Sequence, residues 1–334
     1  MNAELLKRIV RAIASGSQND LDELARKVVD TERKSGHAKL AEELDGILKR
    51  AKKPSGSGTG TDSDRTFREL PLSRRTQELL VTLIPKDALE HHMVLSAETE
   101  SRFCRIEREY AARERLGAYG LKHRKTVLLY GPPGCGKSLG AKRIAWNTGL
   151  PLMKVRFDAL LSSYFGESLS NLRTVFEAAK TKHSVLLLDE CDFIARSRSA
   201  GKDIGEASRV VNMLLQLMEE YDAPGGLLVA TTNLEGSLDE ALFRRFDEVL
   251  QVPHPGPEEI EKLLKLTLSG VTVAKTVAWP PLVAALQGQS AAQIVKVAQD
   301  AAKAAVLSGE KTVDEKHLRL ASAELHRHTP GTLH

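Results

Sequence analysis

The sequence predicts an α/β fold in which a parallel five-stranded sheet carries helices on both of its faces. Three observations lead to this prediction. Short apolar runs alternate with helical stretches, a glycine-rich loop follows the first of these runs, and the last part of the chain shows helical periodicity with no strong strand. Near-continuous apolar strands are typical of a parallel sheet that is buried on both sides. We therefore expect an α/β core with an all-α C-terminal lid and a small helical module before it.

The predicted strands and helices alternate along the middle of the chain. The strands are the apolar runs at 126–130, 152–157, 184–188, 227–231 and 247–252. The predicted helices between them cover 137–148, 168–181, 205–221 and 238–244. This alternation is what strand–helix–strand units with parallel pairing require.

The chain is expected to divide into five segments. Residues 54–64 contain no apolar side chain and are rich in Gly and Ser, so we expect a flexible linker with a root-mean-square span of roughly 18 Å. Before it, residues 1–53 predict a helical module that binds a partner or substrate. After it, residues 65–119 predict a charged helical lead-in whose charges form i,i+4 pairs. The core then covers 120–256 and the helical lid covers 257–328.

The composition excludes several classes of protein. The 334 residues carry 48 Lys and Arg against 44 Asp and Glu, and a net charge of +4 is too weak a bias for a surface that binds nucleic acid. Three cysteines exclude a disulfide scaffold. The sequence has neither an apolar run long enough to span a membrane nor a secretory signal at its start. We expect a cytoplasmic protein, although its basic, amphipathic first helix leaves binding to a membrane surface open as an alternative.

Residues 131–138 read Gly-Pro-Pro-Gly-Cys-Gly-Lys-Ser and fit the phosphate-binding pattern G-x-x-x-x-G-K-[ST]. Backbone N–H groups of such a loop surround a β-phosphate, and the following helix adds its positive end. Lys137 is expected to neutralise the β- and γ-phosphates and Ser138 to ligate Mg²⁺. The predicted nucleotide-binding residues are Pro132, Pro133, Gly134, Cys135, Gly136, Lys137, Ser138, Leu139 and Asp189.

Polar side chains follow two of the later predicted strands. Asp189 and Glu190 come directly after the run 185–188, and Asn233 follows the next strand along the chain. Ligands bind at the carboxyl ends of the strands in an open α/β sheet. We expect Asp189 to hold the Mg²⁺ shell, Glu190 to orient and polarise the attacking water, and Asn233 to help place that water. The alternatives are a pair of acids that cap the next helix and an asparagine that serves a turn.

Taken together, these residues resemble the AAA+ ATPase superfamily, and within it the AAA subfamily in its stand-alone bacterial form. Residues 131–138 correspond to Walker A, 185–190 to Walker B, and Asn233 to the sensor-1 position. The run Ala241-Leu-Phe-Arg-Arg-Phe-Asp247 is similar to the arginine-finger segment of the group that contains spastin and katanin. Residues 257–328 match the helical lid, and residues 288–292 lack a sensor-2 arginine, as in the AAA subfamily. Residues 117–121 are expected to contact adenine.

The resemblance implies an ATPase that depends on Mg²⁺ and assembles into a ring, usually a hexamer. Arg244 and Arg245 are then expected to act in trans on ATP that the neighbouring subunit binds; the alternative is a plain surface pair. Tyr164, Phe165 and Gly166 resemble the pore loop of members that thread proteins. An aromatic side chain can grip a polypeptide by apolar contact, but these residues would also suit a core.

Two functions remain in competition at this point. The first is an ATP-driven unfoldase or protein-complex remodeller that threads polypeptide by its pore-loop aromatics. The second is an ATP-gated regulatory switch that binds and controls one dedicated partner, for example a separately encoded protease, without threading. A nucleic-acid motor is disfavoured by the missing basic patch, and no H-E-x-x-H motif of a fused metalloprotease occurs.

Overall fold

The computed structural model of the protein describes residues 70–73, 75–160, 165–192, 204–223, 225–233, 243–310 and 312–328. The chain divides into two compact units, Met1–Arg68 and Glu69–His334, and every described residue belongs to the second unit. The predicted helical module over 1–53 and the linker over 54–64 therefore lie outside the described residues. The same holds for most of the predicted helix over 238–244.

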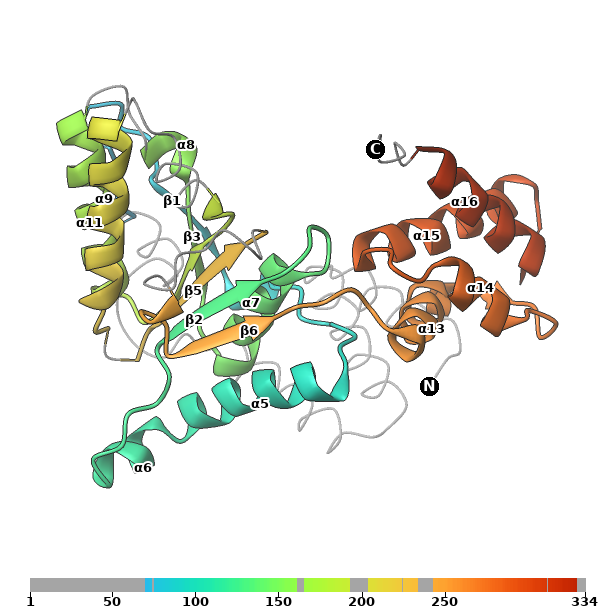
Figure 1. Cartoon of the computed structure of the whole chain (residues 1–334), viewed down its shortest axis with the longest axis horizontal. Helices are drawn as coiled ribbons and strands as arrows, with labels where there is room; N and C mark the ends of the chain where they lie inside the picture. Colours follow the sequence, from blue (N-terminus) through green and yellow to red (C-terminus); the bar gives the residue numbers. More distant parts are fainter. Residues whose placement is uncertain are drawn as a thin grey trace, which may run out of the picture. The chain divides into compact units, whose positions relative to one another are not determined.

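A six-stranded sheet organises the described part of the core (Figure 1). Its strands are β1 (Val81–Ile84), β2 (Thr126–Tyr130), β3 (Leu152–Val155), β4 (Val185–Leu188), β5 (Leu227–Thr232) and β6 (Glu248–Gln251). They follow the order β1-β3-β4-β5-β2-β6, in which β2 to β6 pair in parallel and β1 pairs antiparallel with β3. The predicted α/β fold with five parallel strands is confirmed, and a sixth strand is added at one edge.

Strand β1 corrects the expectation that the lead-in over 65–119 is purely helical. It has only four residues, and Val81 lies opposite Val155 of β3 in the antiparallel register. Leu80 and Val81 are both fully buried, and the Leu80 carbonyl accepts a hydrogen bond from the Arg156 amide at 2.9 Å. A strand of four residues is too short to show a clear periodicity. Its partner lies some 70 residues further along the chain, so the pairing leaves no local pattern either.

Helices cover both faces of the sheet, as predicted. Those of the core are η1 (Lys86–Ala88), α5 (Ala97–Ala111), α6 (Arg113–Ala118), α7 (Lys137–Thr148), α8 (Phe157–Leu160), α9 (Phe165–Thr181) and α11 (Ile204–Glu219). Val127 and Leu129 of β2 are buried together with α5 and α7, whereas Leu128 between them is buried together with α9 and α11. This alternation follows from the two-residue period of a strand. Figure 1 shows α9 and α11 side by side on their face of the sheet.

The C-terminal segment has its own hydrophobic core. Its elements are α13 (Pro257–Thr267), η2 (Leu268–Gly270), β7 (Thr272–Val273), α14 (Trp279–Ala285), α15 (Ala291–Leu307), β8 (Thr312–Val313) and α16 (Glu315–His328). Four α-helices form most of the predicted lid, and α15 starts with a capping box between Ser290 and Gln293. The expectation of an all-α lid missed the parallel pair β7–β8, because each of these strands has only two residues.

None of the described helices is both long enough and apolar enough to span a membrane.

Candidate nucleotide site at the carboxyl edge of the sheet

The glycine-rich loop (residues 131–138) joins the end of β2 to the start of α7. Gly131, Gly134 and Gly136 adopt φ angles of +140°, +75° and +98°, a region that side chains other than glycine rarely enter. A Cβ atom on Gly131 would lie 2.3 Å from the Val252 carbonyl oxygen. The loop therefore requires glycine where the sequence has it. It ends at the N-terminus of α7, where unpaired backbone N–H groups favour an anion.

Lys137 is buried within this loop, with 7% of its surface exposed. Its Nζ donates hydrogen bonds to the carbonyl oxygens of Gly131 at 2.8 Å and Pro132 at 2.7 Å. Burial lowers the pKa of the Lys137 ammonium. Carbonyl oxygens are weak partners for a buried ammonium, so a phosphate group would be a stronger acceptor in this position.

The remaining predicted loop residues surround this lysine. Pro133 and Gly134 form the exposed tip, and Leu139 is half-buried in the first turn of α7. Cys135 is buried, and its Sγ lies 3.7 Å from the His254 Nδ1. The Gly134 carbonyl accepts a hydrogen bond from the Ala292 amide at 3.0 Å, which brings the first residues of α15 to the loop.

Asp189 stands at the end of β4 with a side chain that is 7% exposed. Its Oδ1 accepts hydrogen bonds from the hydroxyls of Ser138 and Thr231, each at 2.7 Å, and its Oδ2 accepts one from the Lys154 Nζ at 2.6 Å. Burial alone would raise the pKa of Asp189, but the hydrogen bonds from Lys154, Ser138 and Thr231 hold it below its ordinary value. The group is therefore an ionised carboxylate.

The oxygen atoms of Ser138 and Asp189 suit a magnesium ion. They lie 2.7 Å apart, and neighbouring ligands of an octahedral Mg²⁺ with bonds of about 2.1 Å are about 3 Å apart. Hydroxyl and carboxylate oxygens are also the ligand types that this hard cation prefers. The two residues that the sequence singled out for Mg²⁺ are thus brought together with fitting chemistry.

Glu190 and Asn233 lie close to Asp189, and hydrogen bonds to neighbouring residues hold each of them in place. The Glu190 backbone has a φ of +57°, and its amide donates to the Thr231 hydroxyl at 2.9 Å while its side chain is exposed. Asn233 donates two hydrogen bonds to the Asp192 carboxylate, one from its backbone N–H at 2.9 Å and one from its side-chain Nδ2 at 3.0 Å. Sequence reasoning missed both Thr231 and Asp192. The one feature of the sequence that could have indicated them is their position within two residues of the predicted Asn233 and Glu190.

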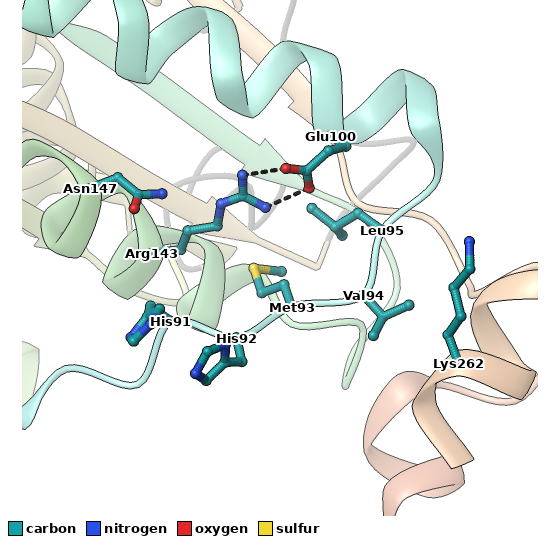
Figure 2. Close-up of a pocket in the computed structure, with 9 residues that line it drawn as sticks. All are labelled: His91, His92, Met93, Val94, Leu95, Glu100, Arg143, Asn147 and Lys262. Atoms are coloured by element: carbon teal, nitrogen blue, oxygen red, sulfur yellow. Dashed lines mark hydrogen bonds and ion pairs between the residues drawn. The ribbon is translucent and has the colours of Figure 1, made fainter. Parts of the chain in front are cut away.

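A pocket of about 400 Å³ adjoins the glycine-rich loop (Figure 2). Its lining residues are His91, His92, Met93, Val94, Leu95, Glu100, Arg143, Asn147 and Lys262. The Met93 methyl is in contact range of Gly136, since a Cβ there would lie 3.3 Å from it. The His91 ring stacks on Trp146 of α7 with centroids 4.1 Å apart. No pattern in the sequence predicted this pocket.

Residues 117–121, which were expected to contact adenine, are not among the residues that line this pocket. These residues precede β2, whereas the glycine-rich loop follows it, so the two lie at opposite ends of the strand. Tyr119 and Leu121 are 80% and 58% exposed.

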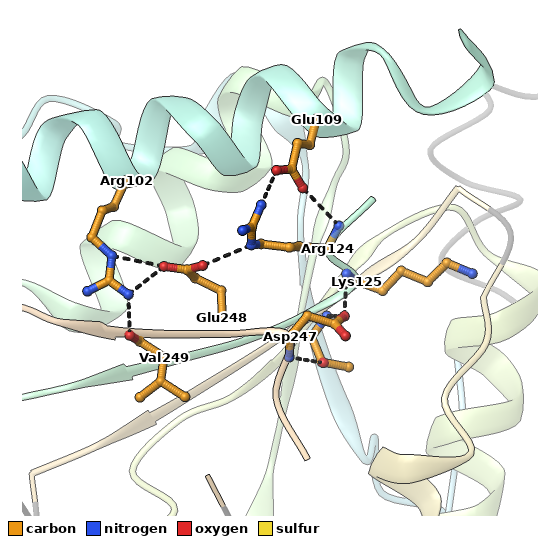
Figure 3. Close-up of polar contacts among 8 residues, drawn as sticks. Arg102, Glu109, Arg124, Lys125, Asp247, Glu248 and Val249 are labelled. Atoms are coloured by element: carbon orange, nitrogen blue, oxygen red, sulfur yellow. Dashed lines mark hydrogen bonds and ion pairs between the residues drawn. The ribbon is translucent and has the colours of Figure 1, made fainter. Parts of the chain in front are cut away.

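Arg244 and Arg245 also lie at the start of β2, away from the glycine-rich loop. The Thr126 hydroxyl donates to the Arg245 carbonyl at 3.4 Å. Asp247 accepts hydrogen bonds from the amides of Lys125 and Thr126 at 2.8 and 3.0 Å (Figure 3). Five residues of strand separate this end of β2 from the loop, which is roughly 15 Å. Arg244 is exposed, and the Arg245 Nε lies 3.3 Å from the Glu219 carboxylate.

An ion network holds this region to α5 (Figure 3). Glu248 accepts a hydrogen bond from the Arg102 Nε at 2.9 Å and pairs with the Arg124 Nε at 2.8 Å, and Arg124 also pairs with Glu109. The ion pairs of Arg102 and Glu109 thus join α5 to other parts of the fold, which corrects the expectation of i,i+4 pairs along the helix.

The predicted pore-loop residues fall largely outside the described structure. Helix α9 begins at Phe165, with Gly166 as its second residue. Tyr164 and the side chains of Phe165 and Gly166 are not among the described residues, so this prediction stays a prediction.

A parallel sheet with a glycine-rich loop and paired acidic residues at its carboxyl edge defines a nucleotide-binding α/β protein. Residues 127–254 match the family described as ATPase family associated with various cellular activities (AAA). The chain is also 34% identical over 329 residues to an uncharacterized AAA family ATPase, y4kL, of Sinorhizobium fredii, across 98% of this chain and 96% of that protein. The chain belongs to the AAA family of ATPases, and it hydrolyses ATP.

Other relatives match the chain over a shorter length. The chain is 34% identical over 216 residues to the proteasome-activating nucleotidase of Methanosarcina mazei, across 63% of this chain and 51% of that protein. It is 33% identical over 199 residues to proteasome-activating nucleotidase 2 of Halobacterium salinarum, across 58% of this chain and 48% of that protein. The chain thus spans about half the length of these nucleotidases.

Proposed function

We propose that this protein is an ATP-driven remodeller or unfoldase of polypeptides that works as a ring, with six subunits. One observation carries the proposal for a ring. Arg244 and Arg245 lie at the end of β2 opposite to the glycine-rich loop, so they are too far away to serve the nucleotide of their own subunit. A neighbouring subunit could present them to that nucleotide, as a ring of identical interfaces would do at every site.

The chemistry follows from the side chains at the carboxyl edge of the sheet. We propose that the loop amides and Lys137 bind the phosphates and that Ser138 and Asp189 hold Mg²⁺. The metal ion would neutralise charge on the β- and γ-phosphoryl oxygens. Glu190 is exposed beside this position and is assigned to orient and polarise the attacking water. Asn233, which Asp192 holds in place, is assigned to position the same water.

The pocket beside the loop is assigned to the base and ribose of the nucleotide. Met93 lines this pocket and also lies against Gly136 of the loop. The mixture of apolar and polar side chains in the lining suits a flat heterocycle with hydrogen-bonding edges. This assignment replaces the earlier interpretation of residues 117–121.

The neighbour's Arg244 and Arg245 complete the site in this proposal. A guanidinium beside the γ-phosphoryl group stabilises the charge of the transition state and is worth about 10³–10⁵ in rate in enzymes that use one. Hydrolysis would then depend on the contact between subunits, so a structural change at that contact could be coupled to each ATP turnover.

Polypeptide is the proposed substrate, gripped by Tyr164 with Phe165 and Gly166 beside it. Two of the relatives are named for activating the proteasome, which supports a protein partner, including a separately encoded protease. We propose that residues 1–53 recruit this partner and that the protein works in the cytoplasm without nucleic acid.

A trap tests this function. Glu190→Gln should bind ATP without hydrolysing it, so a tagged variant purified in ATP and Mg²⁺ should retain polypeptides held in the ring. Many unrelated polypeptides, lost when Tyr164→Ala is added and kept with Tyr164→Phe, support threading. A single stoichiometric protein that stays bound without Tyr164 contradicts threading and indicates an ATP-gated switch.

A further inference from the structure

Asp189 has a positively charged partner that the proposed mechanism does not use. The Lys154 Nζ lies 2.6 Å from the Asp189 Oδ2, while the hydroxyls of Ser138 and Thr231 both donate to Oδ1. Among the described residues, Lys154 is thus the only cation that an ion pair joins to this carboxylate. Because both hydroxyls donate to Oδ1, Oδ2 is the oxygen that would face the water molecules around a metal ion held by Ser138 and Asp189.

The backbone of Lys154 is fixed, but its side chain is able to move. In the sheet, Lys154 lies between Thr82 of β1 and Leu187 of β4. Strands on both sides therefore prevent a shift of the main chain. The Lys154 side chain is 45% exposed, whereas that of Asp189 is 7% exposed. A lysine side chain that is half in solvent can withdraw its ammonium group into water at small cost.

Electrostatic repulsion disfavours the binding of a lysine ammonium and a magnesium ion to the same carboxylate at the same time. An ammonium that already neutralises Asp189 reduces the attraction of this group for a second cation, and it repels Mg²⁺ directly. Two of the three hydrogen bonds to Asp189 come from neutral hydroxyls, which are compatible with a metal ion nearby. The contact with Lys154 is the one that has to be given up.

We propose that Lys154 is a built-in counterion of Asp189 that competes with Mg²⁺, so that binding of the Mg²⁺–ATP complex displaces the Lys154 ammonium from the carboxylate. The inference rests on the proposed role of Ser138 and Asp189 as the Mg²⁺ site. In the nucleotide-free protein the ammonium neutralises a carboxylate that is nearly buried. Each round of nucleotide exchange then includes a switch of this partner.

The test is the Mg²⁺ dependence of nucleotide binding, measured without turnover. Full-length protein carrying Glu190→Gln binds a fluorescent ATP analogue at fixed concentration, and free Mg²⁺ is titrated from an EDTA-buffered start at constant ionic strength. Lys154→Met should lower the half-saturating Mg²⁺ concentration by roughly threefold to tenfold, because one positive charge beside the site is removed. Lys154→Arg should stay close to the parent protein. Lys180→Met, which removes a surface lysine paired with Glu177, is the matched control.

The outcomes separate the inference from the assignment on which it rests. An unchanged or higher half-saturating Mg²⁺ concentration in Lys154→Met overturns the inference. So does weaker ATP binding at an unchanged Mg²⁺ midpoint, which would mean that Lys154 binds phosphate. If the parent protein binds ATP equally with and without Mg²⁺, the proposed metal site itself is wrong. Should Lys154→Met fail to fold, Lys154→Gln gives the same comparison.

Discussion

At the residue scale, Thr231 connects the two acidic residues on which the proposed chemistry depends. Its hydroxyl donates to the Asp189 Oδ1 at 2.7 Å and accepts from the Glu190 amide at 2.9 Å. One side chain therefore sets the rotation of the Asp189 carboxylate and the backbone path into Glu190. The positive φ of Glu190 shows that this path is constrained. Residues of this kind orient a site without touching the substrate.

Thr231→Val should lower kcat by about tenfold to a hundredfold, as is usual when a residue that orients a metal ligand is lost. The valine keeps the shape but leaves the Glu190 amide and Asp189 each without one hydrogen bond. Steady-state ATPase assays check this, and ATP affinity should change much less than kcat. Thr174→Val, at a hydroxyl that only serves its own helix through Ser170, is the control.

Lys137 and Glu190 should separate binding from hydrolysis. Lys137→Ala is expected to weaken ATP binding by more than about tenfold, since it removes a charged partner of the phosphates. Glu190→Gln should keep ATP binding and lower the hydrolysis rate by about 10²–10⁴, the usual contribution of a general base. Equilibrium binding and ATPase rates on the same preparations distinguish the two. Equal loss of binding in both variants would refute the assigned roles.

At the element scale, α5 and α7 are joined by a charged contact that the local pattern could not reveal. Arg143 of α7 donates two hydrogen bonds to Glu100, each at 2.6 Å, and one to Glu107 at 3.0 Å. The arginine side chain is 9% exposed. Its hydrogen bonds with Glu100 in turn lower the pKa of that carboxyl against the opposing effect of burial. This contact fixes the helix that carries Lys137 against its neighbour.

Arg143→Met should lower the free energy of unfolding at pH 7 by about 2 kcal/mol, allowing for the partial exposure of Glu100. The folded pKa of Glu100 lies below its ordinary value of 4.5, so its contribution is present above that pH and disappears as the pH falls through the folded pKa. Denaturation at pH 7 and near pH 3.5 should show the difference shrinking. Arg319→Met, at an i,i+4 pair with Glu315 on the surface, should leave the free energy of unfolding nearly unchanged at either pH.

Strand β1 gives a second test at this scale. A chain that starts at residue 69 keeps the second compact unit and should fold cooperatively. A chain that starts at residue 90 loses Leu80 and Val81, whose burial contributes about 3–6 kcal/mol together. Thermal unfolding of both chains checks this. Equal stability would show that β1 is dispensable.

The elements differ in how far the sequence could predict them, for physical reasons. The bounds of β2 and α7 were predicted as the structure has them, because an apolar run and a glycine-rich loop mark both ends. Strand β3 ends earlier than predicted, since Phe157 begins α8. Strands β1, β7 and β8 are too short to show a period. Pairs such as Arg143 with Glu100 join residues far apart in the chain, and such pairs leave no local pattern.

At the scale of the whole molecule, the two halves of the proposed ATPase chemistry lie at opposite ends of β2. Lys137, Asp189 and Glu190 cluster at the carboxyl edge of the sheet, and Arg244 and Arg245 lie at the other edge. The sequence shows the order of the two sets along the chain, whereas only the folded structure shows that they lie at opposite ends of a strand. Because of this separation, the proposed chemistry requires an assembly in which one subunit presents Arg244 and Arg245 to the nucleotide of its neighbour.

The most direct test of this central claim is a mixing experiment on ATP hydrolysis. Arg244→Ala keeps its own nucleotide site and Arg245 but cannot offer Arg244 to its neighbour, whereas Lys137→Ala keeps Arg244 but lacks the phosphate-binding lysine. Each variant alone should be nearly inactive. An equal, randomly assembled mixture should recover up to about one quarter of the wild-type rate per subunit, because that share of interfaces pairs an intact site with an intact arginine. A mixture no more active than the two variants measured separately, or an Arg244→Ala protein that hydrolyses ATP at the wild-type rate, would contradict the account.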